Sequence, residues 1–347
     1  MSAPSVCFLG CGAMSARHIR TLRRLRPGLT VGVASRDAQR AQSFGGRVGA
    51  KDCFGSYETA IASSYDVIAV VVPPSAHRAL VEQAVRAGKH VLVEKPAFNS
   101  LAELETLWPL LKSAAGVVMV AENLHFAPFH RKLAGLVRAP ALGRPLLLDL
   151  IRLGRSAPRG WRADPAEMPL GALHEGGVHW IRRLMDFAAV FEADATDHVL
   201  DVSAFAPPAP VTTTPGEDTM MVVARHRSGL VSRLFHTWAV PWRFPPFDAS
   251  KILLEHGALY FDARGLGARF YAPGGRRFVM PSVRDAGGFR EMWRHFLSCV
   301  EARRPPDLTL EHVFADFAYL DAAYRSTRSH RPEAPSRPPP LAQGPVS

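Results

Sequence analysis

The stretch VCFLGCGAMS, residues Val6–Ser15, decides the fold because it joins an apolar run to a glycine-rich turn and the start of a helical pattern. In such a turn, Gly10 allows a sharp change of direction and Gly12 lets the backbone approach a pyrophosphate. The helix that follows offers unpaired amides and a partial positive charge near Ala13 and Met14. We therefore expect these four residues to bind a dinucleotide, although the same pattern also occurs at ordinary strand–helix turns.

The first 120 residues alternate short apolar runs with helical patterns. Strands are expected at 6–10, 30–34, 67–72, 91–93 and 117–121, and helices at 14–25, 38–44, 76–87 and 101–114. Strands joined by helices of this length imply right-handed crossovers and a parallel sheet. The strands are apolar throughout, as expected where both faces of a sheet are covered.

The pattern changes after Glu122. Helices are expected at 128–137, 176–190, 290–301 and 310–325, whereas strands are expected at 146–153 and dominate from 197 to 281. This favours a second, α+β domain with a large, mostly antiparallel sheet. We predict a dinucleotide-binding domain at 1–122, a second domain at 123–330 and a disordered tail at 331–347. The tail holds six prolines and few large apolar side chains, so burial cannot offset the cost of ordering it.

Composition argues against several other classes of protein. The chain has 347 residues, 47% of them hydrophobic, and no run of 18 apolar residues, so no membrane span is expected. Its net charge of +11 comes mostly from scattered arginines, without the basic stripe typical of nucleic-acid binding. The N-terminus lacks the features of a secretory signal, and four cysteines suggest neither a disulfide framework nor a zinc site. A cytoplasmic protein with reduced thiols is therefore expected.

The end of the second expected strand bears on the choice of cofactor. An acidic side chain there usually holds the ribose hydroxyls of NAD, whereas a hydroxyl and an arginine hold the 2′-phosphate of NADP. Ser35 and Arg36 fit the second pattern, and a guanidinium binds phosphate in a bidentate, charge-assisted way. Asp37 follows directly and complicates the choice, and Arg36 could also be a solvated loop residue. NADP is the predicted cofactor, with NAD as the alternative.

A lysine ends the fourth expected strand, in the stretch VLVEKP at Val91–Pro96. The carboxyl end of a parallel strand faces the crevice where ligands bind, which makes Lys95 a candidate active-site residue. Only six of the 42 basic residues are lysines, so the composition of the chain does not by itself explain a lysine at this position. A surface lysine before a proline turn is the alternative interpretation.

A carboxylate and an imidazole stand close together in the stretch GALHEGGVH at 171–179. Glu175 and His179 are four residues apart and share a helical face if the helix has already begun. Such a pair can exchange a proton with a substrate. It could also bind a metal or be a helix cap beside a satisfied histidine. No clear third ligand is present, so no metal site is predicted.

These motifs together resemble the Gfo/Idh/MocA family of NAD(P)-dependent oxidoreductases, which includes glucose–fructose oxidoreductase and inositol dehydrogenase. The resemblance runs from about Val6 to Leu184, and the later sheet fits in outline. It rests on the glycine turn, on Val72-Pro73-Pro74 followed by His77, on AGKHVLVEKP at 87–96, on Glu122-Asn123, on WRADP at 161–165 and on Gly177-Val178-His179.

The resemblance implies a Rossmann domain and a C-terminal α+β domain whose open sheet forms a homodimer or homotetramer. It implies that Lys95 is the active-site lysine, that His179 transfers the proton and that Glu175 orients His179 or tunes its basicity. The implied cofactor-binding residues are Gly10, Gly12, Ala13, Met14, Ser35, Arg36, Pro73, His77, Glu94 and Lys95. The implied substrate-binding residues are Lys95, Asn123, Trp161, Arg162 and His179.

Two residues depart from the family's pattern. Glu175 falls where many members have aspartate, and Arg182 stands where an acidic residue is common. Glu175 has one methylene more than aspartate, which changes the geometry of its pair with His179. Arg182 could serve a carboxylated or phosphorylated substrate, or it could face solvent.

The expected activity is hydride transfer between NADP(H) and the secondary alcohol or ketone carbon of a small polar substrate, such as a sugar or cyclitol. Imine or enone reduction is an alternative, because the wall of the substrate site would lie at 123–165 and 235–250, mostly outside the motifs. A dinucleotide-binding redox sensor or scaffold without catalysis is a further alternative. The presence of both Lys95 and His179 disfavours it.

Overall fold

The computed structural model describes residues 4–240, 250–282 and 284–341. Contacts group these residues into two compact units. The first unit contains the chain up to Glu122, the segment Phe289–Phe314 and the residues from Pro338 onward. The second contains Asn123–Gly288 and Ala315–Arg337. Within the described ranges, no helix is both long and apolar enough to cross a membrane.

The first unit is built on a six-stranded sheet in which every neighbouring pair is parallel, in the order β3-β2-β1-β4-β5-β6. The strands are β1 (Val6–Leu9), β2 (Val31–Ala34), β3 (Asp52–Phe54), β4 (Val67–Val70), β5 (His90–Val93) and β6 (Val118–Val120). All residues of β1, β2 and β4 are buried, as the continuous apolar runs predict for strands covered on both faces. The predicted parallel sheet is confirmed.

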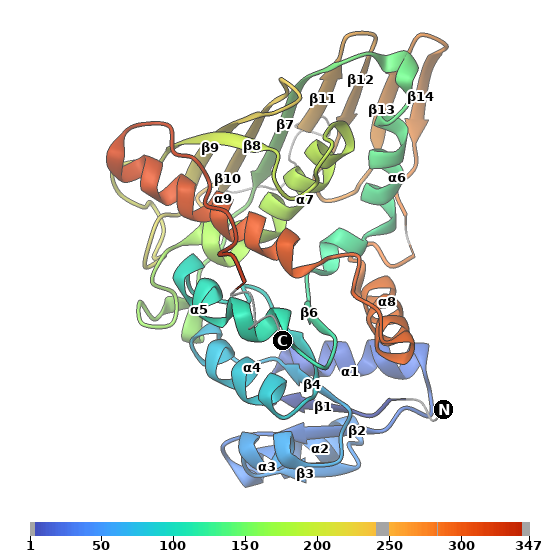
Figure 1. The fold of residues 1–347 in the computed structure, drawn as a ribbon, viewed down its shortest axis with the longest axis vertical. Helices are drawn as coiled ribbons and strands as arrows, with labels where there is room; N and C mark the ends of the chain where they lie inside the picture. The colour runs from blue at the N-terminus through green and yellow to red at the C-terminus, as the bar shows by residue number, and fades with distance from the viewer. Residues whose placement is uncertain (1–3, 241–249, 283, 342–347) are drawn as a thin grey trace, which may run out of the picture. The chain divides into compact units, whose positions relative to one another are not determined.

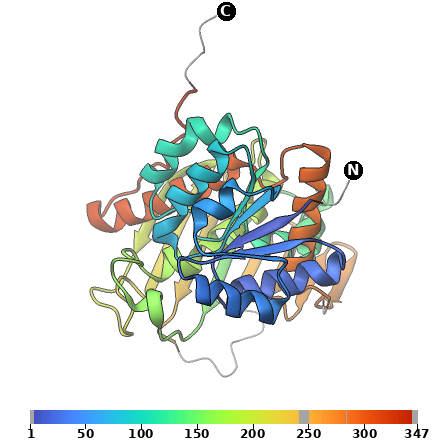
Figure 2. The ribbon, with the colours of Figure 1, turned by 90° about the horizontal axis from the view of Figure 1, so that it is seen from below.

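Helices cover both faces of this sheet. They are α1 (Ala13–Leu25), α2 (Ala38–Val48), α3 (Tyr57–Ala62), α4 (His77–Arg86), α5 (Leu101–Lys112) and α8 (Phe289–Ala302). Figure 2 shows α1 and α2, in blue, on one side of the strands, and α4 and α5, in cyan to green, on the other. Side chains of Asp37, Ser56 and Ser100 cap the first turns of α2, α3 and α5, which fixes where these helices begin.

The second unit is built on an eight-stranded sheet, in the order β14-β13-β12-β11-β7-β10-β9-β8 (Figure 1). Its strands are β7 (Pro145–Leu153), β8 (Val199–Phe205), β9 (Thr219–His226), β10 (Val231–Thr237), β11 (Ser250–Leu254), β12 (Gly257–Phe261), β13 (Ala268–Ala272) and β14 (Gly275–Val279). Only β7 and β10 pair in parallel, and the other pairs are antiparallel. The prediction of a mostly antiparallel second sheet is confirmed.

The second unit has two main helices of its own, α6 (Pro128–Val137) and α7 (Val178–Ala188). A third helix, α9 (Leu310–Ser329), begins in the first unit and continues in the second. Short helical turns connect these elements: η2 (Asn123–Phe126), η3 (Pro140–Leu142), η4 (Gly160–Ala163), η5 (Leu173–Gly177) and η6 (Ala189–Phe191). A similar turn, η1 (Pro74–Ala76), precedes α4 in the first unit.

One late segment groups with the first unit by its contacts, whereas the sequence prediction placed it in the second domain. This segment, Phe289–Phe314, includes α8, which packs beside α1. The Trp293 indole N–H donates to His18 Nδ1 at 2.9 Å, and the Phe289 ring lies 5.3 Å from the His18 ring. Both partners are buried, so an apolar face of α8 completes the core around α1.

The C-terminal segment corrects the prediction of a disordered tail from residue 331. Glu333 exchanges two backbone hydrogen bonds of 2.9 Å with Val202, on the edge strand β8. Arg325 pairs with Glu333, and Arg337 Nη2 lies 2.9 Å from Asp197 Oδ2. The prolines lack N–H donors, but the residues between them supply backbone groups to the open edge of the sheet. The prediction is therefore wrong for 331–337, and residues 342–347 lie outside the described residues.

Candidate active site

The glycine turn joins β1 to α1 at the carboxyl edge of the parallel sheet. Gly10 has φ 109°, and a Cβ built on it would lie 2.2 Å from Val71 O, so the turn itself requires glycine. Gly12 has φ −109°, and among the described residues nothing lies within 4 Å of a Cβ built there. The fold alone therefore does not require glycine at position 12. A ligand that packs against the turn would require it, because a Cβ would occupy the same space.

The N-terminus of α1 is suited to an anion. No side chain caps it, and its first turn carries no acidic residue, so its amides face outward with the positive end of the helix dipole. Ser15, which stands in place of the usual third glycine or alanine, is fully buried, and its Oγ donates to Gly10 O at 2.6 Å. This hydrogen bond holds the turn on the helix. Gly10, Gly12, Ala13 and Met14 thus form a cradle that fits a dinucleotide pyrophosphate.

Ser35 and Arg36 follow β2 at the same edge. Asp37, which complicated the choice of cofactor, is the N-cap of α2: its Oδ1 accepts from Gln39 N at 2.9 Å and Arg40 N at 3.2 Å. Arg36 is exposed and neighbours the Tyr57 hydroxyl. Burial raises the pKa of Tyr57, and the positive charge of Arg36 acts in the opposite direction. The Asp37 carboxylate therefore accepts hydrogen bonds from its own helix, while the Arg36 guanidinium remains at the surface.

Pro73 and His77 follow β4. The His77 ring is fully buried, with Nε2 2.9 Å from Val72 O and Nδ1 3.0 Å from Pro96 O. Burial lowers the pKa of His77, so the ring is neutral and only one nitrogen can donate at a time. The ring joins the chain after β4 to the chain after β5, and so shapes the edge where Lys95 lies.

Glu94 and Lys95 follow β5, and a buried relay fixes the Glu94 carboxylate. An indole N–H can only donate, so Trp293 Nε1 donates to His18 Nδ1 at 2.9 Å. His18 therefore carries its proton on Nε2, which lies 2.6 Å from Glu94 Oε1. The other carboxylate oxygen, Oε2, accepts from the Lys95 backbone N–H at 3.0 Å. The backbone that presents Lys95 is thus held by a chain of hydrogen bonds reaching to α8.

In the second unit, Glu175 lies within a wide helical turn, and His179 lies just after it. The segment Leu173–Gly177 is a π-helix, and α7 begins directly after it at Val178. The spacing of four residues predicted a shared face for ordinary α-helical geometry, which a π turn changes by adding about one residue per turn. π turns are frequent at functional sites. Glu175 is buried, whereas His179 is partly exposed.

The partner that the structure gives Glu175 is Arg162, which the sequence placed in the substrate site. Arg162 Nε donates to Glu175 Oε1 at 2.9 Å, and its guanidinium lies 4.3 Å from the Trp161 ring centroid. Asn123, the remaining predicted substrate residue, is buried and donates through Nδ2 to Gly287 O. The structure thus joins Trp161, Arg162 and Glu175 into one cluster. Part of the predicted substrate wall, 241–249, lies outside the described residues.

Glu217, which was not among the predicted site residues, supports the π turn. Its Oε1 accepts from Leu173 N at 2.7 Å and from the Tyr324 hydroxyl at 3.1 Å. Its Oε2 is buried, and no partner for that atom lies among the described residues. Burial raises the pKa of Glu217 to about 7. A lone glutamate between Gly216 and Asp218 carries no sequence signal, because only the fold brings it to Leu173 and Tyr324.

Glu217→Gln should stabilise the protein above neutral pH. The folded chain keeps the Glu217 proton up to pH about 7, whereas the unfolded chain loses it near 4.5, so the free energy of unfolding falls as pH rises through this window. The whole shift corresponds to about 3 kcal/mol. Glutamine keeps the accepting oxygen and cannot ionise. Urea unfolding should therefore show a gain over wild type at pH 8 that shrinks towards pH 5.

Glu255→Gln is the control for this experiment. Arg144 lowers the pKa of the exposed Glu255 carboxyl below its usual value of 4.5, so Glu255 is ionised in both the folded and the unfolded chain from pH 5 to pH 8. Its substitution should therefore lower stability slightly and by the same amount at both pH values. A Glu217→Gln variant less stable than wild type at pH 8, or one with the same difference at both pH values, would contradict the assignment.

Arg182 has neither of the two roles considered for it from the sequence. Its side chain is 1% exposed, so it does not face solvent. Its Nε donates to Asp186 Oδ1 at 3.0 Å, and its Nη1 lies 3.1 Å from Asp316 Oδ1 on α9. The other Asp186 oxygen lies 2.8 Å from His125 Nδ1. The guanidinium is thus a buried link between α7 and α9.

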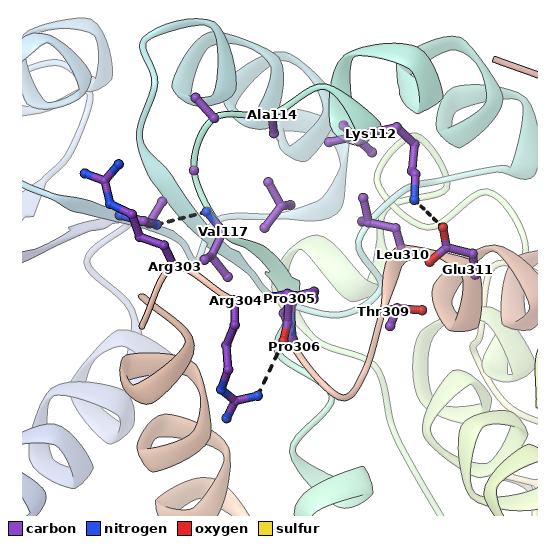
Figure 3. A pocket seen from close by; sticks show the side chains of 15 residues that line it. Lys112, Ala114, Val117, Arg303, Arg304, Pro305, Pro306, Thr309, Leu310 and Glu311 are labelled. Atoms are coloured by element: carbon purple, nitrogen blue, oxygen red, sulfur yellow. Dashed lines mark hydrogen bonds and ion pairs between the residues drawn. The ribbon is translucent and has the colours of Figure 1, made fainter. Parts of the chain in front are cut away.

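A cavity of about 440 Å³ lies in the first unit, away from the cofactor edge (Figure 3). It is lined by His90 and Val118, where β5 and β6 begin, and by residues such as Arg303 and Arg304 that follow α8. These are the amino ends of the strands, whereas the glycine turn and Lys95 lie at the carboxyl ends. The cavity is therefore separate from the predicted cofactor site.

The first unit, with its parallel sheet and glycine turn, is that of an NAD(P)-binding protein. A family model described as "Oxidoreductase family, NAD-binding Rossmann fold" (GFO_IDH_MocA) matches residues 5–122. Through these residues the chain is similar to the Gfo/Idh/MocA family of NAD(P)-dependent oxidoreductases.

Named relatives agree with this family. The chain is 22% identical to D-apiose dehydrogenase from Paraburkholderia graminis over 93% of this chain and 88% of that protein. It is 31% identical to inositol 2-dehydrogenase 2 from Saccharopolyspora erythraea, over 50% of this chain and 51% of that protein. The chain thus spans only about half the length of the second relative.

Solved structures share the whole fold. Levoglucosan dehydrogenase in complex with NADH superposes with a TM-score of 0.83 at 17% identity, over 96% of this chain and 99% of that chain. An oxidoreductase from Agrobacterium radiobacter in complex with NAD⁺, L-tartaric acid and magnesium gives 0.80 at 18% identity, over 96% of this chain and 98% of that chain. At these identities the likeness defines the architecture of both units and leaves the substrate open.

Proposed function

We propose that this chain transfers a hydride between NADP(H) and the secondary alcohol or ketone carbon of a small polar substrate, a sugar, a cyclitol or a derivative. The observation that carries the proposal is the arrangement at the carboxyl edge of the parallel sheet. There the glycine cradle follows β1 and Lys95 follows β5, with β4 between these two strands, and the Glu94 relay fixes the lysine's backbone. The relatives named as dehydrogenases of D-apiose and inositol support the substrate class.

In this proposal, His179 and Lys95 act on one substrate oxygen. When bound, the nicotinamide supplies the hydride acceptor for oxidation or the hydride donor for reduction. In oxidation His179 takes the hydroxyl proton as general base, and the Lys95 ammonium donates a hydrogen bond to the same oxygen, which stabilises its developing negative charge. Glu175, held by Arg162, sets the environment of His179. Asn123, Trp161 and Arg162 are the proposed substrate contacts.

A substrate screen tests the proposal directly. Polyols, sugars, cyclitols and ketones are offered with NADP⁺ or NADPH, and nicotinamide absorbance is followed. Turnover of an alcohol or its ketone supports the proposal. Turnover of imines or enones alone would replace it with the reductase alternative, and cofactor binding without turnover of any class would favour a redox sensor.

Arg36→Ala should weaken NADP binding far more than NAD binding. Arg36 is exposed at the end of β2, while Asp37 is engaged as a helix cap, which supports a 2′-phosphate partner for the guanidinium. A lost charge-assisted contact typically costs about 1.5–3 kcal/mol, or roughly one to two orders of magnitude in affinity. Titration of both cofactors into wild type, Arg36→Ala and the control Arg24→Ala, an exposed arginine in the last turn of α1, gives the comparison. Equal losses of affinity for both cofactors would contradict the proposed preference for NADP.

We also propose that the open face of the eight-stranded sheet joins copies of this chain into a homodimer or homotetramer. α7 packs on β7 and β10 from one side. The other face carries partly exposed apolar residues around an ion pair of Arg233 with Asp149, at 2.7 Å. Phe235 and Ile151 lie next to this pair in the strand register. Light scattering should give a mass of two or four chains, and a monomer at micromolar concentration would contradict the proposal.

A further inference from the structure

Two histidines and a glutamate converge at one end of the second unit, in a cluster that the proposed function does not use. Glu192 directly follows η6, His198 immediately precedes β8, and His226 is the last residue of β9. One potential ligand atom from each lies within 4.8 Å of the other two. Residues 192 and 198 are close in the chain, whereas 226 reaches them only because β8 and β9 pair.

The distance between the two imidazoles matches a shared ion. His198 Nδ1 and His226 Nδ1 lie 2.9 Å apart. Two nitrogens bound to one cation at about 2.0–2.1 Å, at angles between octahedral and tetrahedral, lie about 2.9–3.4 Å apart. The same distance also fits a hydrogen bond that shares one proton between the rings. The choice between a proton and a cation depends on the groups around the pair.

The outer nitrogen of His226 already has the partner that a metal ligand requires. Its Nε2 lies 2.7 Å from Ser232 Oγ, which can accept its N–H and so leave a lone pair on Nδ1. Metal-binding histidines usually donate their second N–H to such a partner, which fixes the tautomer.

Glu192 supplies an anionic oxygen and a path to solvent. Its carboxylate accepts hydrogen bonds from Ser228 N, at 3.1 Å to Oε2, and from Ser228 Oγ. These bonds orient the carboxylate on the turn that follows His226. Glu192 is partly exposed, whereas both histidines are buried, so an ion can reach the cluster from the glutamate side.

We propose that Glu192, His198 and His226 bind a divalent transition-metal ion, with zinc as the best-fitting member of the class. Two imidazole nitrogens and one carboxylate oxygen suit Zn²⁺, Co²⁺ or Ni²⁺, whereas Mg²⁺ and Ca²⁺ prefer sets of oxygens. The ion would connect the chain just after α7, which carries His179, to the paired ends of β8 and β9. The ion would therefore stabilise the second unit by linking these two segments, and water would complete its coordination sphere.

The test uses full-length, tag-free protein freed of metal with a chelator. Zinc titration by calorimetry should give one site per chain, and saturating zinc should raise the thermal unfolding midpoint. Replacing Zn²⁺ with Co²⁺ should produce a visible absorption band from imidazole coordination. Glu192→Gln keeps an oxygen for the Ser228 N–H but loses the charge. Losing even an outer partner of a ligand typically weakens metal affinity about 10–100-fold, so this variant should bind zinc at least about tenfold more weakly.

Two further variants make the test decisive. His226→Asn removes a ligand and should abolish both the thermal shift and the Co²⁺ band. His256→Gln alters an exposed histidine on the turn between β11 and β12 and should change neither. If His226→Asn does not fold, Glu192→Gln alone decides. The proposal is overturned if zinc produces no thermal shift in wild type, or if Glu192→Gln binds zinc as tightly as wild type does. The first result would mean that the imidazoles share a proton, and the second that zinc binds without Glu192.

Discussion

Lys95→Met and His179→Ala should each lower turnover by about 10²–10⁴-fold on a verified substrate, while NADP still binds. Loss of a positioned proton-transfer group typically costs this much in rate. Lys95 follows β5 on a backbone held by Glu94, and His179 lies in the first turn of α7 after a π turn. Steady-state kinetics with a cofactor titration of each variant separates a lost chemical step from lost binding.

Matched substitutions give the control for this experiment. Lys51→Met and His256→Ala alter exposed residues of the same types away from the predicted site, and both should keep wild-type turnover. Glu175→Gln should lower turnover less than Lys95→Met or His179→Ala does, because glutamine keeps the shape of the side chain and loses only its charge. If both active-site variants keep full activity, the mechanism is wrong and a non-catalytic role gains support.

Arg182→Met should lower the free energy of unfolding by about 3–5 kcal/mol, the cost of leaving a buried ion pair without one partner. The variant leaves Asp316, whose side chain is 7% exposed, and Asp186 without their guanidinium. Methionine keeps much of the length and apolar volume of arginine, so the loss reports mainly the uncompensated charge. Urea unfolding of wild type and variant at one pH measures the difference.

Arg225→Met is the control for the Arg182 substitution. Arg225 also pairs with an aspartate, Asp201, but its side chain is 66% exposed. Exposed pairs typically contribute about 0–1 kcal/mol, so this variant should unfold almost as wild type does. Adding Asp316→Asn to Arg182→Met should recover part of the lost stability, because it removes the buried charge. A loss no larger for Arg182→Met than for Arg225→Met would show that the buried pairing contributes little.

The sequence predicted most of the regular elements, because their signals are local. Apolar runs between Gly and Pro residues marked the strands of both sheets, and α6 was predicted with its observed limits, Pro128–Val137. The elements that were missed carry weak patterns. β3 has three half-buried residues, and α3 has six residues. Such elements depend on their neighbours more than on their own side chains.

The contacts that position the site could not be predicted in this way, because they join distant residues. The His18–Glu94 hydrogen bond spans 76 positions and the Trp293–His18 bond spans 275. Nothing local marks Glu217 as the support of the π turn, or Arg182 as buried among carboxylates. The Gly176-Gly177 pair is a weak signal for an irregular turn, since glycine disfavours a regular helix. The sequence therefore predicted the candidate site residues but not the distant residues that position them.

The position of Trp293 also bears on how the protein is synthesised. On the ribosome, residues 1–122 emerge early, and their six strands can pair before the rest of the chain exists. The indole that fixes the His18 tautomer, and through it Glu94 and the Lys95 backbone, is added only after the whole strand region of the second unit has been translated. A nascent first unit therefore lacks the final restraint on its lysine. Its dinucleotide cradle can form during translation, while the edge that presents Lys95 is completed only near the end of synthesis.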